Sequence, residues 1–166
     1  MEKYNKQLNE SCLMEMSNVV GRKCVTDKIP FSFYFSSKDD VPHPIRLKIK
    51  WNREKIGKDL DGYFELHGNY EYVHSTDADA KKPSSKELEV ARQFIKKYKV
   101  LFCAVWEGKL DQDDLASFFK GRVKLRDLLS YLEGISENEY YAINHCHTLE
   151  EIEQCVRELD IFNMWD

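Results

Sequence analysis

Apolar and polar residues alternate most regularly between positions 45 and 52, where the chain reads I-R-L-K-I-K-W-N. A period of two residues predicts a β-strand with one apolar face against a core and one face toward solvent. The second face would carry Arg46, Lys48 and Lys50 in a row. We therefore expect a half-buried strand with a basic outer surface, and we expect the rest of the fold to cover its apolar side.

Three more strands are predicted around this one. The aromatic run F-S-F-Y-F at 31–35 contains residue types that favour a strand. Segments 63–66 and 70–73 are predicted to form a strand pair around the tripeptide H-G-N. With the basic strand they predict an antiparallel meander of about four strands, a common size for a small sheet.

The clearest helix signal follows at about 85–107. Ser84 and Glu87 have the spacing of a capping box, and apolar residues then recur every three or four positions until Gly108 ends the pattern. This helix is expected to pack its apolar stripe on the sheet.

Further patterns predict the remaining elements. They are a short helix within 8–20, a helix at 113–119, a short strand running into a helical turn at 123–132, and a final helix after the capping-box pair Thr148 and Glu151.

The fold class is therefore α+β: an antiparallel meander of about four strands packed by one long helix, about 85–107, with a C-terminal helical extension. We divide the chain into an N-terminal segment (1–30), an α+β core (31–107) and a helical acidic extension (108–166). The extension is expected to pack on or beside the core.

Composition and charge narrow the class of protein. Of 166 residues, 42% are hydrophobic, which is enough for the core of one domain. A net charge of −4 argues against a protein that coats nucleic acid nonspecifically. The charge is uneven, because residues 45–60 hold six Lys or Arg and two acids, whereas residues 133–166 hold nine acids and one Arg. This asymmetry favours attraction within or between chains, or two different partners.

Five widely spaced cysteines without a C-x-x-C pair indicate a reducing compartment, so we expect the protein in the cytoplasm. The first residues lack the apolar core of a signal peptide. No apolar run approaches the roughly 20 residues that cross a bilayer, and no membrane association is expected. The chain contains no complete catalytic or nucleotide-binding motif, and no cofactor is predicted.

The basic strand is the main candidate for a binding surface. The candidate nucleic-acid or partner-binding residues are Arg46, Lys48, Lys50, Arg53 and Lys55. Cations in such a row can contact phosphates. Binding of a single strand also needs aromatic rings on the same face, and Trp51 lies on the opposite face by parity. The alternative is a solvated sheet face, or an edge strand that lysines protect from aggregation.

The histidines are further candidates for chemistry. His43 lies between two prolines and is the candidate general acid or base, although the sequence shows no partner for it. His145 and His147 form an H-x-H pair, which supplies half of a tetrahedral metal site. Cys146 between them suggests a thiolate nucleophile, but such catalysis needs proximity in space rather than in sequence.

The run F-Y-F-S at 33–36, followed by Asp40, Pro42, His43 and an alternating strand, resembles a family of small bacterial domains of unknown function. Members carry F-Y-x-S, an aspartate, prolines and an H-x-H strand, then a strand pair with a glycine and a helix that ends near a tryptophan. The resemblance covers roughly residues 31–107. The second histidine of H-x-H is replaced here, because Pro44 and Ile45 follow His43. The resemblance implies a role beside toxin–antitoxin-type genes.

These observations favour a binding or regulatory module over an enzyme. We expect it to act through protein contacts, including self-association through the apolar residues Phe162, Met164 and Trp165 and through the opposite charges of the two regions above. The alternative is a nucleic-acid-binding or nuclease-like toxin that uses the basic strand 45–58 and His43. A nuclease should place His43 and the basic side chains in one cleft.

Overall fold

The computed structural model describes residues 26–35, 43–51 and 60–166. These residues form a four-stranded antiparallel sheet and five helices, which confirms the α+β class predicted from the sequence. The strands are β1 (Phe31–Tyr34), β2 (Arg46–Trp51), β3 (Gly62–Glu65) and β4 (Tyr72–His74), and they are hydrogen-bonded in chain order. The short helix expected within 8–20 lies outside the described residues.

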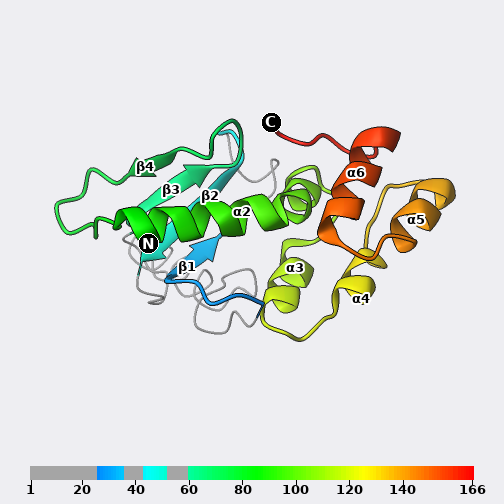
Figure 1. The fold of residues 1–166 in the computed structure, drawn as a ribbon, viewed down its shortest axis with the longest axis horizontal. Helices are drawn as coiled ribbons and strands as arrows, with labels where there is room; N and C mark the ends of the chain where they lie inside the picture. The colour runs from blue at the N-terminus through cyan, green and yellow to red at the C-terminus, as the bar shows by residue number, and fades with distance from the viewer. Residues whose placement is uncertain (1–25, 36–42, 52–59) are drawn as a thin grey trace, which may run out of the picture.

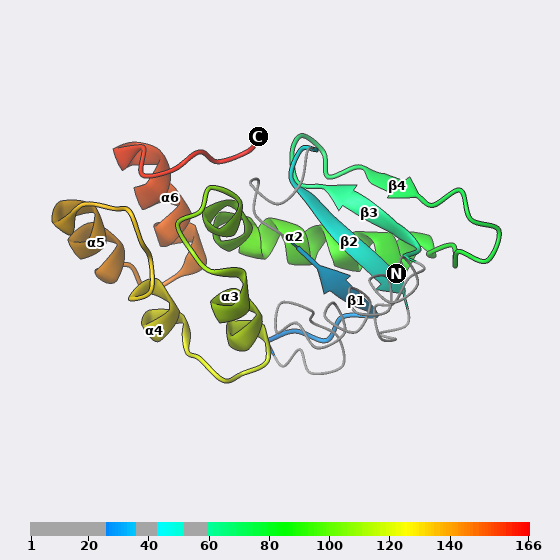
Figure 2. The same ribbon diagram turned by 180° about the vertical axis from the view of Figure 1, so that it is seen from behind.

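The basic strand has the burial pattern that its sequence predicts. In β2, Leu47, Ile49 and Trp51 are at most 1% exposed, whereas the alternate residues are half-buried. Helix α2 (Ser85–Trp106) crosses the apolar face of the sheet and lies in front of it in Figure 1. From behind, in Figure 2, the sheet lies in front of α2. On the face of the sheet opposite α2, no helix or strand among the described residues covers the sheet.

Helix α2 begins as its sequence predicts. The Ser84 side chain accepts a hydrogen bond from Glu87 N (3.1 Å), and the Glu87 carboxylate accepts one from Ser84 N (3.0 Å), which completes a capping box. Its first half buries one stripe, but residues 98–106 are all buried. A helix buried on every side needs partners beyond the sheet.

The remaining helices supply these partners. They are α3 (Gln112–Phe119), α4 (Leu125–Leu129), α5 (Glu137–Asn144) and α6 (Leu149–Leu159). They gather around the C-terminal end of α2, beside the sheet rather than on it (Figure 1). None of the described helices is both long and apolar enough to cross a membrane.

Two parts of this C-terminal region differ from the sequence-based expectation. The helical turn expected within 123–132 is present at Leu125–Leu129, but the short strand expected before it is wrong, because the helix begins at Leu125 and buries the adjacent residues Leu128 and Leu129. Adjacent residues of a strand would point to opposite faces. Helix α5 was not predicted, although Ser136 and Glu139 form a complete capping box at its start.

Phe119 of α3 joins the C-terminal helices to the sheet. Its ring lies 5.4 Å from Phe33 of β1, 5.5 Å from Phe94 and 5.0 Å from Tyr98, measured between centroids. Phe119 and Phe33 are both 0% exposed. The sheet, α2 and the C-terminal helices therefore share one hydrophobic core.

The apolar residues after α6 pack on the chain itself. Phe162 and Met164 are each 8% exposed. Trp165 lies against Trp106, with 6.4 Å between ring centroids, and its indole N–H donates to Glu107 (3.2 Å). These side chains are therefore not the exposed apolar surface on which the expected self-association partly rested. The expectation of a protein partner stays a prediction.

Candidate functional site

The sheet face opposite α2 carries a row of side chains that crosses all four strands. The register pairs Tyr34 with Lys48, Lys48 with Tyr63, and Tyr63 with Val73. Residues paired across strands point to the same side of a sheet. We call this side the open face and define it by eight residues: Ser32, Tyr34, Arg46, Lys48, Lys50, Tyr63, Glu65 and Val73.

Cations and aromatic rings contact each other on the open face. The Arg46 guanidinium carbon lies 4.2 Å above the centroid of the Tyr63 ring, and Lys48 Nζ lies 5.4 Å from that of Tyr34. Both distances are within the range of a cation–π interaction. The two tyrosines thus hold the cations against the sheet. Arg46 Nε is buried and has no hydrogen-bond partner among the described residues.

The positive charge of the open face is concentrated enough to affect ionisation. Burial lowers the pKa of Lys48, and the nearby Arg46 guanidinium lowers it further. Both effects disfavour the charged ammonium in the free protein. A bound anion would reverse the second effect by supplying the opposite charge.

Accessibility differs along the open face. Ser32, the β1 partner of Lys50, is 1% exposed, whereas Val73 on β4 is 37% exposed. The side of the open face toward β4 is therefore the part most available to a ligand.

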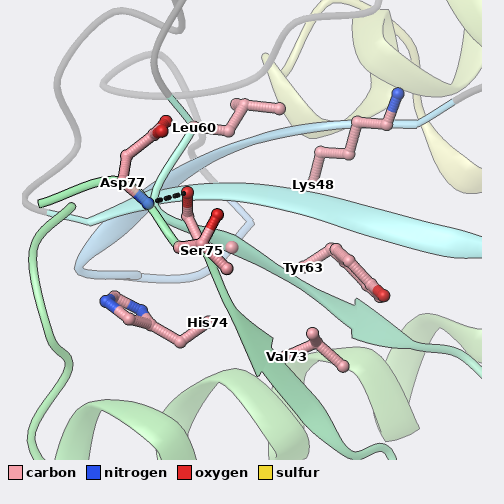
Figure 3. Close-up of a pocket in the computed structure, with 9 residues that line it drawn as sticks. Lys48, Leu60, Tyr63, Val73, His74, Ser75 and Asp77 are labelled. Atoms are coloured by element: carbon pink, nitrogen blue, oxygen red, sulfur yellow. Dashed lines mark hydrogen bonds between the residues drawn. The ribbon is translucent and has the colours of Figure 1, made fainter.

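A hollow of about 440 Å³ lies at this available side. Leu60, Tyr63 and Val73 contribute apolar wall, and the polar groups around it include Lys48, Ser75 and Asp77. Figure 3 shows Lys48 and Asp77 on opposite sides of the hollow. The hollow thus has a cation at one side, a carboxylate at the other, and apolar surface between them.

The buried carboxylate of Asp61 fixes the loop that carries Asp77. It accepts hydrogen bonds from Trp51 N (2.8 Å) and Lys81 N (2.9 Å), and it is 5% exposed. Its backbone carbonyl accepts a third hydrogen bond, from Ser75 N (2.8 Å). Asp61 therefore ties the end of β2 to both ends of the segment 75–81.

A second set of hydrogen bonds holds β4. The Tyr72 hydroxyl accepts from Trp51 Nε1 (3.1 Å) and donates to the Asp61 carbonyl (3.1 Å). His74 Nδ1 lies 3.0 Å from the same hydroxyl. The Tyr72 hydroxyl therefore contacts one residue of each of three neighbouring segments, Trp51, Asp61 and His74. Burial raises the pKa of Tyr72, so this hydroxyl keeps its proton well above neutral pH.

His74 lines the hollow but does not pair with Lys48. Its imidazole points away from Lys48 in Figure 3, and its Nδ1 is used by Tyr72. His74 and Lys48 therefore both border the hollow, but they do not point toward the same atom of a bound ligand.

His43, the histidine favoured by the sequence, lies elsewhere. Its ring stacks on Trp106 of α2 with 6.5 Å between centroids, and its Nδ1 donates to the Pro44 carbonyl (2.8 Å). Helix α2 covers the face of the sheet opposite Lys48. The cleft expected to combine His43 with the basic strand is therefore not formed.

The other basic candidates divide into two groups. Arg46, Lys48 and Lys50 lie on the open face as their alternation predicts. Arg53 and Lys55 lie outside the described residues.

The H-x-H pair lies at the end of α5, far along the chain from the sheet. His145 Nδ1 donates to the Tyr141 carbonyl (2.7 Å), and His147 N donates to the Glu151 carboxylate (2.7 Å). Within the described ranges, no group of three or more His, Cys, Asp or Glu side chains is placed to hold a metal ion. Burial raises the pKa of Cys146 to about 11, so its thiol is protonated at neutral pH and is a poor nucleophile.

Sequence reasoning missed the two tyrosines and Asp77. Tyr34 and Tyr63 supply the aromatic rings that Trp51 could not, since they flank Lys48 on the same face. Their position beside Lys48 depends on the register between neighbouring strands. The sequence shows the alternation within each strand but not this register. Asp77 reaches the hollow only because its loop folds back onto Asp61.

Comparison with known proteins adds no identity: no family model, curated protein or solved structure matches this chain.

Proposed function

We propose that this protein binds single-stranded nucleic acid on the open face of its sheet. The observation that carries the proposal is the row formed by Tyr34, Lys48 and Tyr63, in which a cation lies between two aromatic rings on adjacent strands. Proteins that bind single strands combine cations for the phosphates with rings on which bases stack.

The charge distribution supports contact with phosphates. The open face holds three cations and one carboxylate, Glu65, and that carboxylate lies 3.3 Å from His67. Burial and, after it, repulsion from Arg46 lower the pKa of Lys48, and a phosphate near Lys48 would offset that repulsion. Because the whole protein carries a net charge of −4, binding should depend on this face rather than on general attraction.

The aromatic rings support a preference for single strands over duplexes. Bases that can stack on Tyr34 and Tyr63 are exposed in a single strand and are paired inside a duplex. Phosphates alone would not distinguish the two forms. Preference for single strands is therefore the property that separates this proposal from simple attraction between a basic face and a polyanion.

The test is fluorescence anisotropy with labelled single-stranded RNA, single-stranded DNA and duplex DNA across a salt series. Lys48→Gln should weaken binding and reduce the slope of log K against log salt by about 0.7, the value for one phosphate of a single strand. Tyr63→Leu should weaken binding roughly 5- to 100-fold without changing the slope, because stacking releases no counterions. Tyr63→Phe should retain most of the affinity.

Matched controls come from surfaces away from the sheet. Lys86→Gln removes an exposed cation of α2, and Tyr141→Leu removes an exposed ring of α5 that is 67% exposed. Both should leave affinity and slope unchanged. The proposal fails if no strand binds in a salt-dependent way, or if Lys86→Gln weakens binding as much as Lys48→Gln does.

A further inference from the structure

We infer that the hollow beside Lys48 receives one base of the bound strand and selects guanine through the carboxylate of Asp77. This inference rests on the proposed function, because it takes the strand to lie on the open face. It adds a base preference that the open face alone does not provide.

The position of Lys48 connects the two sites. It belongs to the row on the open face and also borders the hollow. A strand with a phosphate at Lys48 therefore has an adjoining nucleotide at the mouth of the hollow. The volume of about 440 Å³ falls within the range of small-molecule sites, and the apolar side chains Leu60 and Val73 suit the faces of a base.

Charge decides which part of the nucleotide enters. Asp77 stands across the hollow from Lys48 (Figure 3), and a carboxylate there repels a phosphate group. The phosphate should therefore remain at Lys48, while the uncharged base turns toward Asp77.

The chemistry of a carboxylate then distinguishes the bases. An ionised carboxylate only accepts hydrogen bonds. Guanine offers two adjacent donors on its pairing edge, the ring N–H and the exocyclic amino group. Adenine and cytosine offer one amino group beside a ring acceptor, and thymine and uracil offer one N–H between two carbonyls. Asp77 should therefore favour guanine most and thymine or uracil least.

Asp77 is held in place before any ligand binds. Its backbone N–H donates to Ser75 Oγ (3.2 Å), and its carbonyl accepts from Ala80 N (3.2 Å). Among the described residues, none donates a hydrogen bond to the Asp77 carboxylate, and the residue is exposed. The backbone is thus fixed, while both carboxylate oxygens remain available to a base.

The test uses oligothymidine strands of about ten nucleotides, within the site size of small single-strand-binding domains, with one central guanine, adenine, cytosine or thymine. The wild-type protein should bind the guanine strand roughly 5- to 50-fold more tightly than the all-thymine strand, as expected for a paired contact to one base. Asp77→Asn should reduce this ratio to about twofold. Asp79→Asn, an exposed acid in the same loop, should leave the ratio unchanged.

The ratio is the informative quantity, because removing either acid strengthens the attraction of every strand by a similar factor. Equal binding of all four strands by the wild-type protein would overturn the inference, and so would a guanine preference that persists in Asp77→Asn. In both cases, salt-dependent binding that requires Lys48 would leave the proposed function standing. Absence of binding by every strand would overturn both.

Discussion

Gly62 is the residue at which the structure makes its sharpest stability prediction. It pairs with Ile49 and His74 in the sheet, and β4 passes very close to it. A Cβ added to Gly62 would lie 2.4 Å from the Tyr72 hydroxyl oxygen and 2.5 Å from the Val73 carbonyl oxygen. Since one of these atoms belongs to the backbone, Gly62→Ala requires a shift of β4 itself.

The cost follows from two effects. Overpacking of this kind costs about 1–3 kcal/mol. The shift also disturbs the hydrogen bonds that the Tyr72 hydroxyl makes with Trp51 Nε1 and the Asp61 carbonyl, each of which contributes about 0.5–1.5 kcal/mol. Replacing a glycine in a strand by alanine also stabilises the protein by up to about 1 kcal/mol, because it lowers the conformational entropy of the unfolded chain. We expect a net loss of about 2–4 kcal/mol and a Tm lower by roughly 5–15 °C.

Chemical and thermal denaturation of four variants measure this cost. Gly68→Ala is the control, because Gly68 has a φ of +58° and open space around its Cβ position, so only backbone strain of about 1 kcal/mol is expected. Tyr72→Phe removes the closest contact and its hydrogen bonds, so Gly62→Ala should cost about 1 kcal/mol less in that background. The reasoning is refuted if Gly62→Ala costs no more than Gly68→Ala, or if Tyr72→Phe does not change its cost.

Three further outcomes are expected. Phe119→Ala should lower the free energy of unfolding by about 3–5 kcal/mol, measured by urea denaturation, because its ring is fully buried among five other rings. Burial raises the pKa of Cys103 and of Cys146 to about 11, so alkylation of the native protein at pH 8, followed by peptide mass spectrometry, should be roughly tenfold or more slower at both than in the unfolded chain. Hydrogen bonds from Arg157 hold the pKa of Asp166 below its usual range, so its stabilising effect should be present above about pH 3.9 and lost as the pH falls through the lowered value. Because the Asp166 side chain is 67% exposed, Asp166→Asn should cost about 1 kcal/mol or less at pH 7 and progressively less as the pH is lowered below about 3.9, as measured by urea denaturation at a series of pH values.

The sequence alone predicts those elements that have one face in the core and one face in solvent. Alternation in β2 predicted both its strand and its basic face, because only one side of that strand meets the core. The capping box at Ser84 predicted the start of α2 for an equally local reason. Helix α5 also begins with a capping box, at Ser136. Its sequence shows no apolar stripe with helical spacing, because Ile143 is its one buried residue.

The candidate site depended on relations between segments, which local patterns do not contain. A shift of one residue between β2 and β3 would have placed Tyr63 on the covered face and removed it from Lys48. The position of Asp77 depends on the hydrogen bonds that Ser75 N and Lys81 N, at the two ends of its loop, donate to Asp61. His43 was favoured because of its prolines, yet its position is set by Trp106, which comes much later in the chain.

The contact between Phe33 and Phe119 also has a consequence for synthesis on the ribosome. Phe119 is added to the growing chain only after residues 34–118. Until then Phe33 of β1 lacks its hydrophobic contact with Phe119. At about 5–20 residues per second this interval lasts several seconds. During that time the nascent sheet exposes aromatic rings that the finished protein hides completely. Chains that stop before Phe119 should therefore aggregate or be degraded, rather than persist as a smaller folded unit.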